Sequence, residues 1–159
     1  MGTGKSTVGR ALATSQGRRL IDTDDMIISR DGRDIPTIFA QDGEAYFRGL
    51  EQQVMADIAA MDEPAVVSCG GGVVLRDDNI RTMKSSGTVI WLTAGENEIY
   101  RRVVSDTNRP LLAGKKTPEE IKSMMEGRRE KYEKAADITI DTENKTAEEI
   151  ERMIKEELL

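Results

Sequence analysis

The sequence has no histidine and only one cysteine, Cys69, in 159 residues. The lack of histidine excludes imidazole metal sites and histidine-based catalytic triads. A lone cysteine excludes a disulfide framework within the chain. No apolar run approaches the roughly 20 residues that a membrane-spanning helix needs, and the first residues lack the apolar segment of a secretory signal peptide. We therefore expect a cytoplasmic protein without a membrane partner.

The composition that is present is typical of a soluble globular protein, with 33% charged and 38% hydrophobic residues. A length of 159 residues fits one compact domain with its own buried core. The net charge of −6 does not attract nucleic acid, so we expect no nucleic-acid partner. Any bound anion must be held by local arginines or by backbone N–H groups.

Strands and helices are predicted to alternate along the chain. Short runs rich in valine and isoleucine predict strands over Arg19–Asp22, Ala65–Cys69, Thr88–Thr93 and Asp137–Asp141. Helices are predicted over Ser6–Ser15, Asn97–Val104 and Pro118–Tyr132. Apolar residues at helical spacing predict two more, through Phe47, Leu50, Val54 and Ile58 and through Ile150, Met153, Ile154 and Leu158. The fold class is therefore α/β, a parallel sheet flanked by helices in three layers.

The first residues, MGTGKSTVGRALA, contain the end of a phosphate-binding loop. The full pattern is G-x-x-x-x-G-K-[ST], and Gly4, Lys5 and Ser6 match its last three positions. In such a loop the backbone N–H groups and the following helix N-terminus bind phosphate, the lysine reaches the β- and γ-phosphates, and the serine ligates Mg²⁺. The alternative is a glycine turn that only caps a helix at Ser6.

A phosphate-binding loop normally follows a buried strand in the middle of a sheet, and none precedes this one. The first glycine of the pattern would lie two residues before Met1. Either the true start is upstream and Met1 is an internal methionine, which we favour, or the protein begins here and is altered. A sheet without this strand should have two unpaired strand edges.

Three further segments are candidates for an acceptor site. Asp22 and Asp24 end a predicted strand and could hold Mg²⁺ water and a hydroxyl, or Thr23 or Asp24 could cap a helix. Arg48 and Glu51 share a helix face, where they could either belong to a binding site or form an ordinary surface ion pair.

The third segment consists of Gly70, Gly71 and Gly72, which follow a strand and permit a ligand to approach the backbone, unless they form a loose turn. Four arginines could bind an anion or be solvated helix charges: Arg102, Arg109, Arg128 and Arg129.

These segments together resemble shikimate kinase, a family of the nucleoside-monophosphate-kinase-like P-loop group. The matching pieces are GTGKSTVGRALA, IDTD, IFAQDGEAYFRGLE, SCGGG, NRPLL, GRREKY and DITIDT, in this order from residue 2 to about residue 142. The resemblance implies a single kinase domain over residues 1–159, with substrate-binding helices at about 24–60 and a lid at about 109–122. Within it, the first strand is missing from this chain.

The resemblance also implies a role for individual residues, with ATP and Mg²⁺ as cofactors and shikimate as the substrate. The nucleotide is bound by Gly2, Thr3, Gly4, Lys5, Ser6, Thr7, Arg102 and Arg109. Shikimate is bound by Asp24, Arg48, Gly70, Gly71, Gly72 and Arg128. Mg²⁺ is held by Ser6 and, through water, by Asp22. Glu51 orients an arginine of the carboxylate grip, Arg102 stacks on adenine, and Phe39 and Phe47 form pocket walls.

The implied reaction is ATP-dependent phosphorylation of the 3-hydroxyl of shikimate, a step toward chorismate and the aromatic amino acids. Asp24 would take the proton of the attacking hydroxyl, while Lys5 and Arg109 stabilise charge on the transferring group. We expect a monomer. Two alternatives stay open: a related small-metabolite kinase similar to gluconate kinase, or an inactive nucleotide-binding paralogue, which the missing strand favours.

Overall fold

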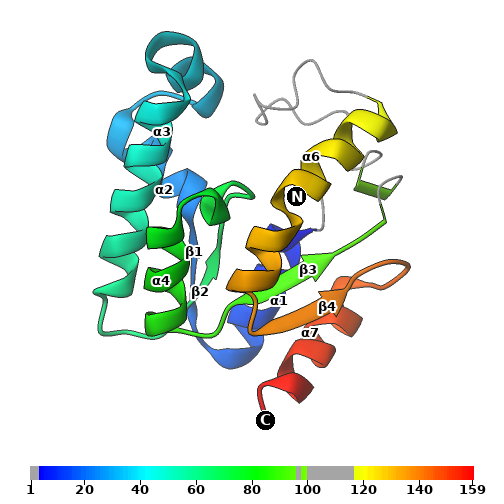
Figure 1. Cartoon of the computed structure of the whole chain (residues 1–159). Coiled ribbons are helices and arrows are strands. Elements are labelled where there is room, and N and C mark those ends of the chain that lie inside the picture. The colour runs from blue at the N-terminus through cyan, green and yellow to red at the C-terminus, as the bar shows by residue number, and fades with distance from the viewer. Residues whose placement is uncertain (1–3, 96–97, 100–116) are drawn as a thin grey trace.

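The computed structural model describes residues 4–95, 98–99 and 117–159, in which helices and strands alternate (Figure 1). The strands are β1 Arg19–Asp22, β2 Ala65–Ser68, β3 Ile90–Thr93 and β4 Ile138–Asp141. The helices are α1 Lys5–Gln16, α2 Thr23–Asp31, α3 Ile35–Ala59, α4 Asp77–Ser86, α6 Pro118–Ala135 and α7 Ala147–Glu157, with a 3₁₀ turn η1 at Val73–Leu75. The predicted helix Asn97–Val104 lies almost wholly outside the described residues.

The strands form two parallel pairs instead of one continuous sheet. β1 pairs with β2 from Arg19↔Ala65 to Asp22↔Ser68. β3 pairs with β4 from Ile90↔Ile138 to Thr93↔Asp141. Within the described residues, no ladder joins β2 to β3. The prediction of two unpaired strand edges is thus confirmed for this part of the chain.

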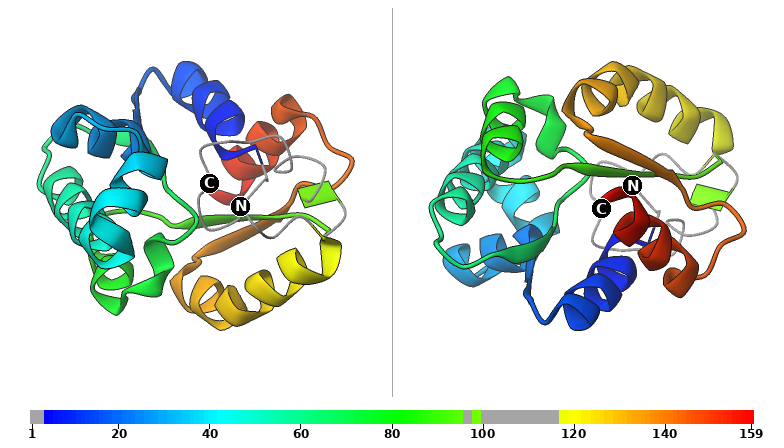
Figure 2. Two further views of the ribbon diagram at one scale, coloured as in Figure 1. Left: turned by 90° about the horizontal axis from the view of Figure 1, so that it is seen from above. Right: turned by 90° about the horizontal axis from the view of Figure 1, so that it is seen from below.

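The strands lie between two helical layers, as the views from above and below show (Figure 2). Helices α1 and α7 cover one face, where a core cluster includes Leu12, Ile140 and Ile154. Helices α4 and α6 cover the other, where Met55 of α3, Val74 and Met83 pack together. The predicted three-layer α/β architecture is therefore confirmed.

Local sequence signals explain where several elements begin and end. Thr117 and Thr146 each form a capping box with the glutamate three residues later, which starts α6 and α7. Gly43 interrupts α3 with φ 82° and ψ 176°, a conformation that only glycine adopts readily. The apolar stripe predicted after this glycine is the second part of α3.

The apolar pattern of the sequence predicted neither α2 nor α4, although the resemblance implied substrate-binding helices at about 24–60. Both begin with acidic residues in the first turn, Asp24 and Asp25 in α2 and Asp77 and Asp78 in α4, which suits the positive end of the helix dipole. Each has few apolar residues, so the periodic signal is weak. No helix in the described part of the chain has the length and apolar character needed to cross a membrane.

Candidate active site

The phosphate-binding end of the chain is formed by Gly4 and the first turn of α1. Gly4 has a left-handed backbone (φ 79°) and precedes Lys5, the first residue of the helix. The buried residues Val8 and Leu12 fix α1 against the strands. The first N–H groups of α1 have no acceptor within the helix, so they can bind phosphate. Gly2 and Thr3 lie outside the described residues.

Ser6 lies beside Asp22, as the predicted Mg²⁺ site requires. The Ser6 Oγ is 3.4 Å from one carboxylate oxygen of Asp22. The other oxygen accepts hydrogen bonds from the N–H groups of Asp24 (2.9 Å) and Asp25 (3.2 Å). Asp22 itself thus caps α2, and the alternative in which Thr23 or Asp24 is the cap is wrong.

A hydroxyl and a carboxylate at this spacing fit Mg²⁺, which prefers hard oxygen ligands and keeps several waters or phosphate oxygens. The described residues contain no group of three or more acidic, cysteine or histidine side chains that could hold a metal by themselves. A cation at Ser6 and Asp22 would therefore need ligands from phosphate and water.

The glycine loop after β2 is in close contact with the acceptor-site candidates. A Cβ at Gly70 would lie 3.0 Å from Asp24 Oδ1 and 3.2 Å from Glu51 Oε2. A Cβ at Gly72 would overlap the guanidinium group of Arg48. Close packing against functional side chains, and not a loose turn, therefore explains these two glycines.

Thr23 holds the same loop from the opposite side. Its hydroxyl accepts a hydrogen bond from the Gly70 N–H at 3.0 Å, and its side chain is fully buried. The bond ties the start of α2, which carries Asp24, to the glycine loop. The sequence indicates Thr23 only as a possible helix cap, because nothing local predicts a partner 47 residues away.

Arg48 and Glu51 form a buried ion pair on α3. The Arg48 Nη1 donates to Glu51 Oε1 at 2.9 Å, and the residues are only 7% and 1% exposed. The alternative that Arg48 and Glu51 form an ordinary surface ion pair is therefore excluded. Burial raises the pKa of Glu51, and the nearby positive charge of Arg48 opposes this shift. Within the described residues, Glu51 Oε2 has no hydrogen-bond partner.

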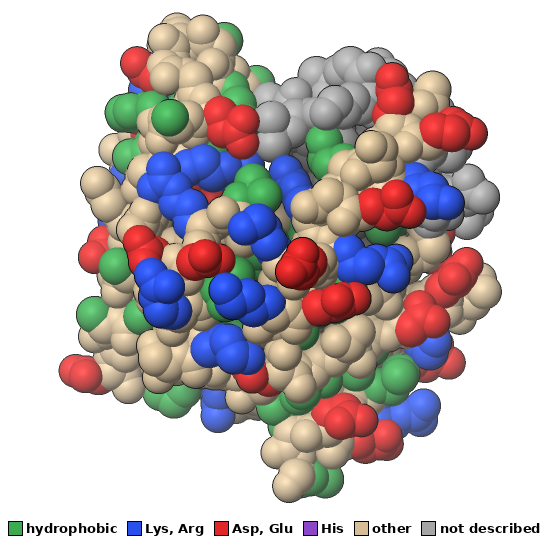
Figure 3. All heavy atoms as spheres, in the orientation of Figure 1, with side chains coloured by type: hydrophobic (Ala, Val, Ile, Leu, Met, Phe, Trp, Pro, Cys, Tyr) green, Lys and Arg blue, Asp and Glu red, His purple; other side chains and the backbone are tan. Residues whose placement is uncertain are grey.

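Arg128 of α6 approaches the same carboxylate from another helix. It is 8% exposed, and its charge also lowers the pKa of Glu51, whereas Asp24 raises it. Both arginines that were predicted to grip a carboxylate therefore act electrostatically on Glu51, and Arg48 also bonds to it. Arg129, by contrast, is exposed, as expected for a solvated helix charge. In the space-filling view, cationic side chains gather at the base of a hollow between the upper part of α3 and α6 (Figure 3).

Tyr132 links α6 to the glycine loop, and sequence analysis assigned it no role. Its hydroxyl donates to the Gly71 carbonyl at 2.5 Å, and its ring stacks on Trp91 with centroids 5.5 Å apart. Tyr132 follows Arg128 by four residues and so lies on the same helix face. Within GRREKY, this spacing was the available signal for Tyr132. Its partners, Trp91 on β3 and Gly71 after β2, are distant along the chain.

Cys69 lies where the two halves of the site meet. Burial raises its pKa to about 12, so the thiol stays protonated at neutral pH. The charges of Lys5, Glu51, Asp24 and Asp22 all act on the same thiol. Residues expected for phosphate, metal and acceptor binding thus lie near enough to Cys69 for their charges to act on its thiol.

Some of the predicted site residues are not part of the cluster at the glycine loop. Arg102, Arg109 and most of the predicted lid at about 109–122 lie outside the described residues. Phe39 and Phe47 contact each other with ring centroids 4.9 Å apart, in the apolar cluster between α2 and α3. Their role as pocket walls stays a prediction.

Comparison with known proteins identifies the family. A family model described as shikimate kinase matches residues 1–159. The shikimate kinase of Thermodesulfovibrio yellowstonii is 42% identical over 98% of this chain and 90% of its own length. The shikimate kinase of Moorella thermoacetica is 40% identical over 99% of this chain and 90% of its own.

Solved structures agree. Shikimate kinase from Acinetobacter baumannii, in complex with shikimate, has a TM-score of 0.95 at 32% identity, covering 99% of this chain and 88% of that one. A gluconokinase from Sinorhizobium meliloti covers 99% of this chain and 90% of its own, with a TM-score of 0.56 at 18% identity, a likeness of fold alone. The chain belongs to the shikimate kinase family.

Proposed function

We propose that the protein transfers the γ-phosphoryl group of ATP to the 3-hydroxyl of shikimate. The observation that carries this proposal is the meeting of Asp24, Arg48 and Glu51 at the glycine loop. Lys5, at the start of the helix that would bind phosphate, lines the same cavity as Gly70 and Gly71 of this loop. Family membership supplies the reaction, and the cluster supplies groups suited to a hydroxylated carboxylic acid.

The arginines would bind the carboxylate of the acceptor. Arg48 is held by Glu51, so its planar guanidinium has one edge fixed before substrate arrives. Arg128 would approach the same carboxylate from α6. Both residues are buried, which strengthens their interaction with a bound anion.

Asp24 would orient the acceptor hydroxyl and accept its proton as the new O–P bond forms and the bond to ADP breaks. Lys5, at the start of α1, would stabilise charge on the transferred group. Mg²⁺, held by Ser6 and through water by Asp22, would neutralise the phosphates when bound. The proposal also includes Arg109 and a lid at about 109–122. Their roles rest on the sequence alone.

The decisive experiment compares Asp24→Asn with Asp25→Asn. Asp25 is the next residue of α2, and its side chain is exposed. ADP release with and without shikimate should fall by about 100-fold or more for Asp24→Asn, and stay near the parent rate for Asp25→Asn. ADP release that depends on gluconate in place of shikimate, or Asp24→Asn at the parent rate, would contradict the proposal.

We also propose that the protein acts in the cytoplasm as a monomer, with residues 1–159 forming one kinase domain. Among the described residues, the large apolar side chains that are exposed are few and scattered: Tyr46, Leu158 and Leu159. A self-associating surface would present a contiguous apolar patch instead. The molar mass measured by light scattering during size-exclusion chromatography tests the monomer.

A further inference from the structure

Asn79 is a buried amide in the first turn of α4, outside the cluster at the glycine loop. It is 1% exposed, and its Nδ2 donates to the carbonyl of Val73 in η1 at 3.0 Å. Within the described residues, its Oδ1 has no hydrogen-bond partner. A buried acceptor without a partner costs stability, and an apolar residue of similar size would avoid that cost. The reason for an amide at this position is therefore its donor.

The acceptor of this bond lies directly after the glycine loop. Val73 follows Gly72, and a Cβ at Gly72 would overlap Nη1, Nη2 and Cζ of Arg48. The backbone position of Gly72 therefore limits where the guanidinium group can lie. Two backbone bonds of 3.1 Å keep the segment tight, from the Val73 N–H to the Gly70 carbonyl and from the Leu75 N–H to the Gly72 carbonyl. The segment from Gly70 to Leu75 thus moves as one unit, and Asn79 holds it at the Val73 carbonyl.

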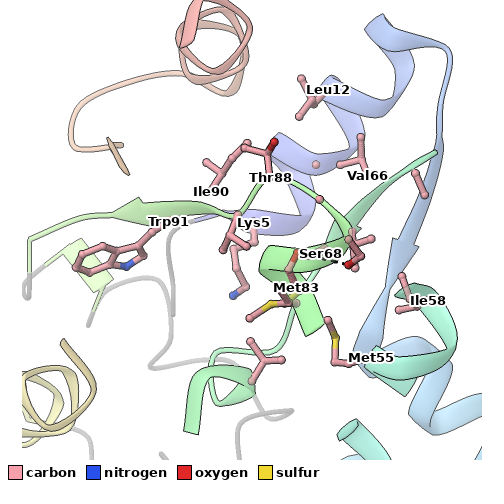
Figure 4. A pocket seen from close by; sticks show the side chains of 18 of the residues that line it. Lys5, Leu12, Met55, Ile58, Val66, Ser68, Met83, Thr88, Ile90 and Trp91 are labelled. Atoms are coloured by element: carbon pink, nitrogen blue, oxygen red, sulfur yellow. Dashed lines mark hydrogen bonds between the residues drawn. The ribbon is translucent and has the colours of Figure 1, made fainter. Parts of the chain in front are cut away.

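Apolar packing also holds η1 against α4, but such packing has no direction. Val73 and Val74 share a core cluster with Met83 of α4 and Met55 of α3, and these two methionine side chains lie close together in Figure 4. Hydrophobic contacts tolerate small shifts of one surface over another, whereas a hydrogen bond weakens steeply with distance and angle. The bond from Asn79 supplies the direction that the packing lacks.

The start of α4 is tied to α3, the helix that carries Arg48. Gln52 follows Arg48 by four residues, and its Oε1 accepts from Arg76 Nη1 at 2.6 Å, just before α4 begins. Asn79 comes three residues after Arg76. These bonds complete a closed ring of contacts that runs along α3, through the start of α4 and η1 to Gly72, and back to Arg48. Gly72 is therefore held at a fixed place relative to Arg48.

We propose that Asn79 is a positioning residue for the acceptor site. Through the Val73 carbonyl it sets Gly72 against Arg48, and thereby fixes the orientation in which Arg48 meets the carboxylate of the acceptor. The inference rests on the proposed function, because it takes Arg48 as a group that binds this carboxylate. Asn79 acts through the backbone of the loop, so its loss should weaken binding of the acceptor and affect ATP much less.

The first test compares Asn79→Leu with Ile80→Val. Leucine is similar in size but cannot donate to Val73, and it removes the unpaired Oδ1, so the melting midpoint should change little. Ile80 is the next residue of α4, is 3% exposed and belongs to the same core cluster, so its shortening loosens the packing but keeps the bond. In steady-state kinetics, KM for shikimate should rise about 5-fold or more for Asn79→Leu and less than about 2-fold for Ile80→Val. KM for ATP should stay within about 2-fold of the parent in both.

Asn79→Asp adds a readout that a general loss of stability would not produce. The introduced carboxyl has the same shape and can donate to the Val73 carbonyl only when it is protonated. Burial and the adjoining exposed carboxylates of Asp77 and Asp78 raise the pKa of this carboxyl. The ratio of the variant's KM for shikimate to that of the parent should therefore fall from about pH 8.5 to about pH 6, as protonation restores the donor.

Parent KM values for Asn79→Leu, or equal increases in Asn79→Leu and Ile80→Val, would overturn the inference. An elevated ratio for Asn79→Asp that does not fall at low pH would also overturn it, and this variant decides the matter if Asn79→Leu does not fold. A parent chain without shikimate-dependent ADP release would refute the proposed function instead. Amide exchange over residues 72–75 then decides whether Asn79 holds the loop: faster exchange in Asn79→Leu than in Ile80→Val supports this, and equal exchange overturns it.

Discussion

At the scale of single residues, Glu51 serves to orient Arg48 more than to stabilise the fold. Burial raises its pKa above the ordinary 4.5. A raised pKa in the folded state means that stability falls as the pH rises from the unfolded value to the folded one. Ionisation of the buried Glu51 therefore costs stability, an effect partly offset by Arg48, and the benefit of the pair is the fixed orientation of Arg48.

Replacing Glu51 with Gln should raise KM for shikimate by about 10-fold or more, because Arg48 loses its charged hydrogen-bond partner. KM for ATP should change much less. Steady-state kinetics with each substrate varied gives both values. The control is Glu44→Gln, since Glu44 contacts the same arginine at 3.4 Å with an exposed side chain. Equal effects of the two substitutions would contradict the assigned role of Glu51.

The pair was visible in the sequence, because Arg48 and Glu51 are three residues apart on a periodic helix. The spacing left open whether it was a surface pair, since exposure depends on what packs against the helix. Gly70 abuts Glu51 and Gly72 abuts Arg48 from the loop after β2, 19 and 24 positions further along the chain. Only the folded chain brings them together.

At the scale of elements, α6 is attached to the glycine loop by Tyr132. The hydroxyl bond to Gly71 and the ring stack on Trp91 hold the helix that carries Arg128. Tyr132→Phe should keep the stack and lose the bond, so KM for shikimate should rise about 3-fold to 10-fold, as expected for a bond worth about 1 kcal/mol.

The matched control for this change is Tyr46→Phe. Tyr46 donates to Asp31 at 2.9 Å on the exposed side of α3, away from the glycine loop. Kinetics of both variants with shikimate and ATP would separate substrate positioning from a general effect of losing a phenol. A Tyr132→Phe enzyme with parent KM values would show that the bond to Gly71 is dispensable.

The start of β3 and β4 depends on Asp137. Its carboxylate accepts from Lys84 and from the Val89 N–H, both at 2.8 Å. These bonds, led by that of Lys84, hold its pKa below 3.8. They also explain why the sequence predicted both strands too long: Thr88, Val89 and Asp137 belong to the junction, not to the ladder.

A carboxylate with a lowered pKa stabilises the fold above its unfolded pKa, and this stability is lost as the pH falls through the folded value. Asp137→Asn should therefore lower the free energy of unfolding at pH 7 by about 1 kcal/mol and reduce its loss below about pH 4. Urea unfolding at several pH values measures both effects. If parent and variant lost the same free energy of unfolding at acid pH, protonation of Asp137 would not be coupled to folding.

At the scale of the whole molecule, the interrupted sheet should limit stability. Among the described residues, β2 and β3 each have one edge without a strand partner. We expect the 159-residue form to melt early or to aggregate, because such edges pair with other chains. Calorimetry and light scattering on heating provide the measurement. One cooperative transition well above about 50 °C, near the middle of the usual range, would contradict this expectation.

The sequence by itself determined the order of the elements and the end of the phosphate-binding loop, since these depend on residues adjacent along the chain. Local spacing also identified the glycines and both buried arginines as candidates. Tertiary structure alone decided that Asp22 lies beside Ser6 and that Thr23 and Tyr132 hold the glycine loop. Their partners lie 16, 47 and 61 residues apart, and contacts of that range leave no periodic signal in the sequence.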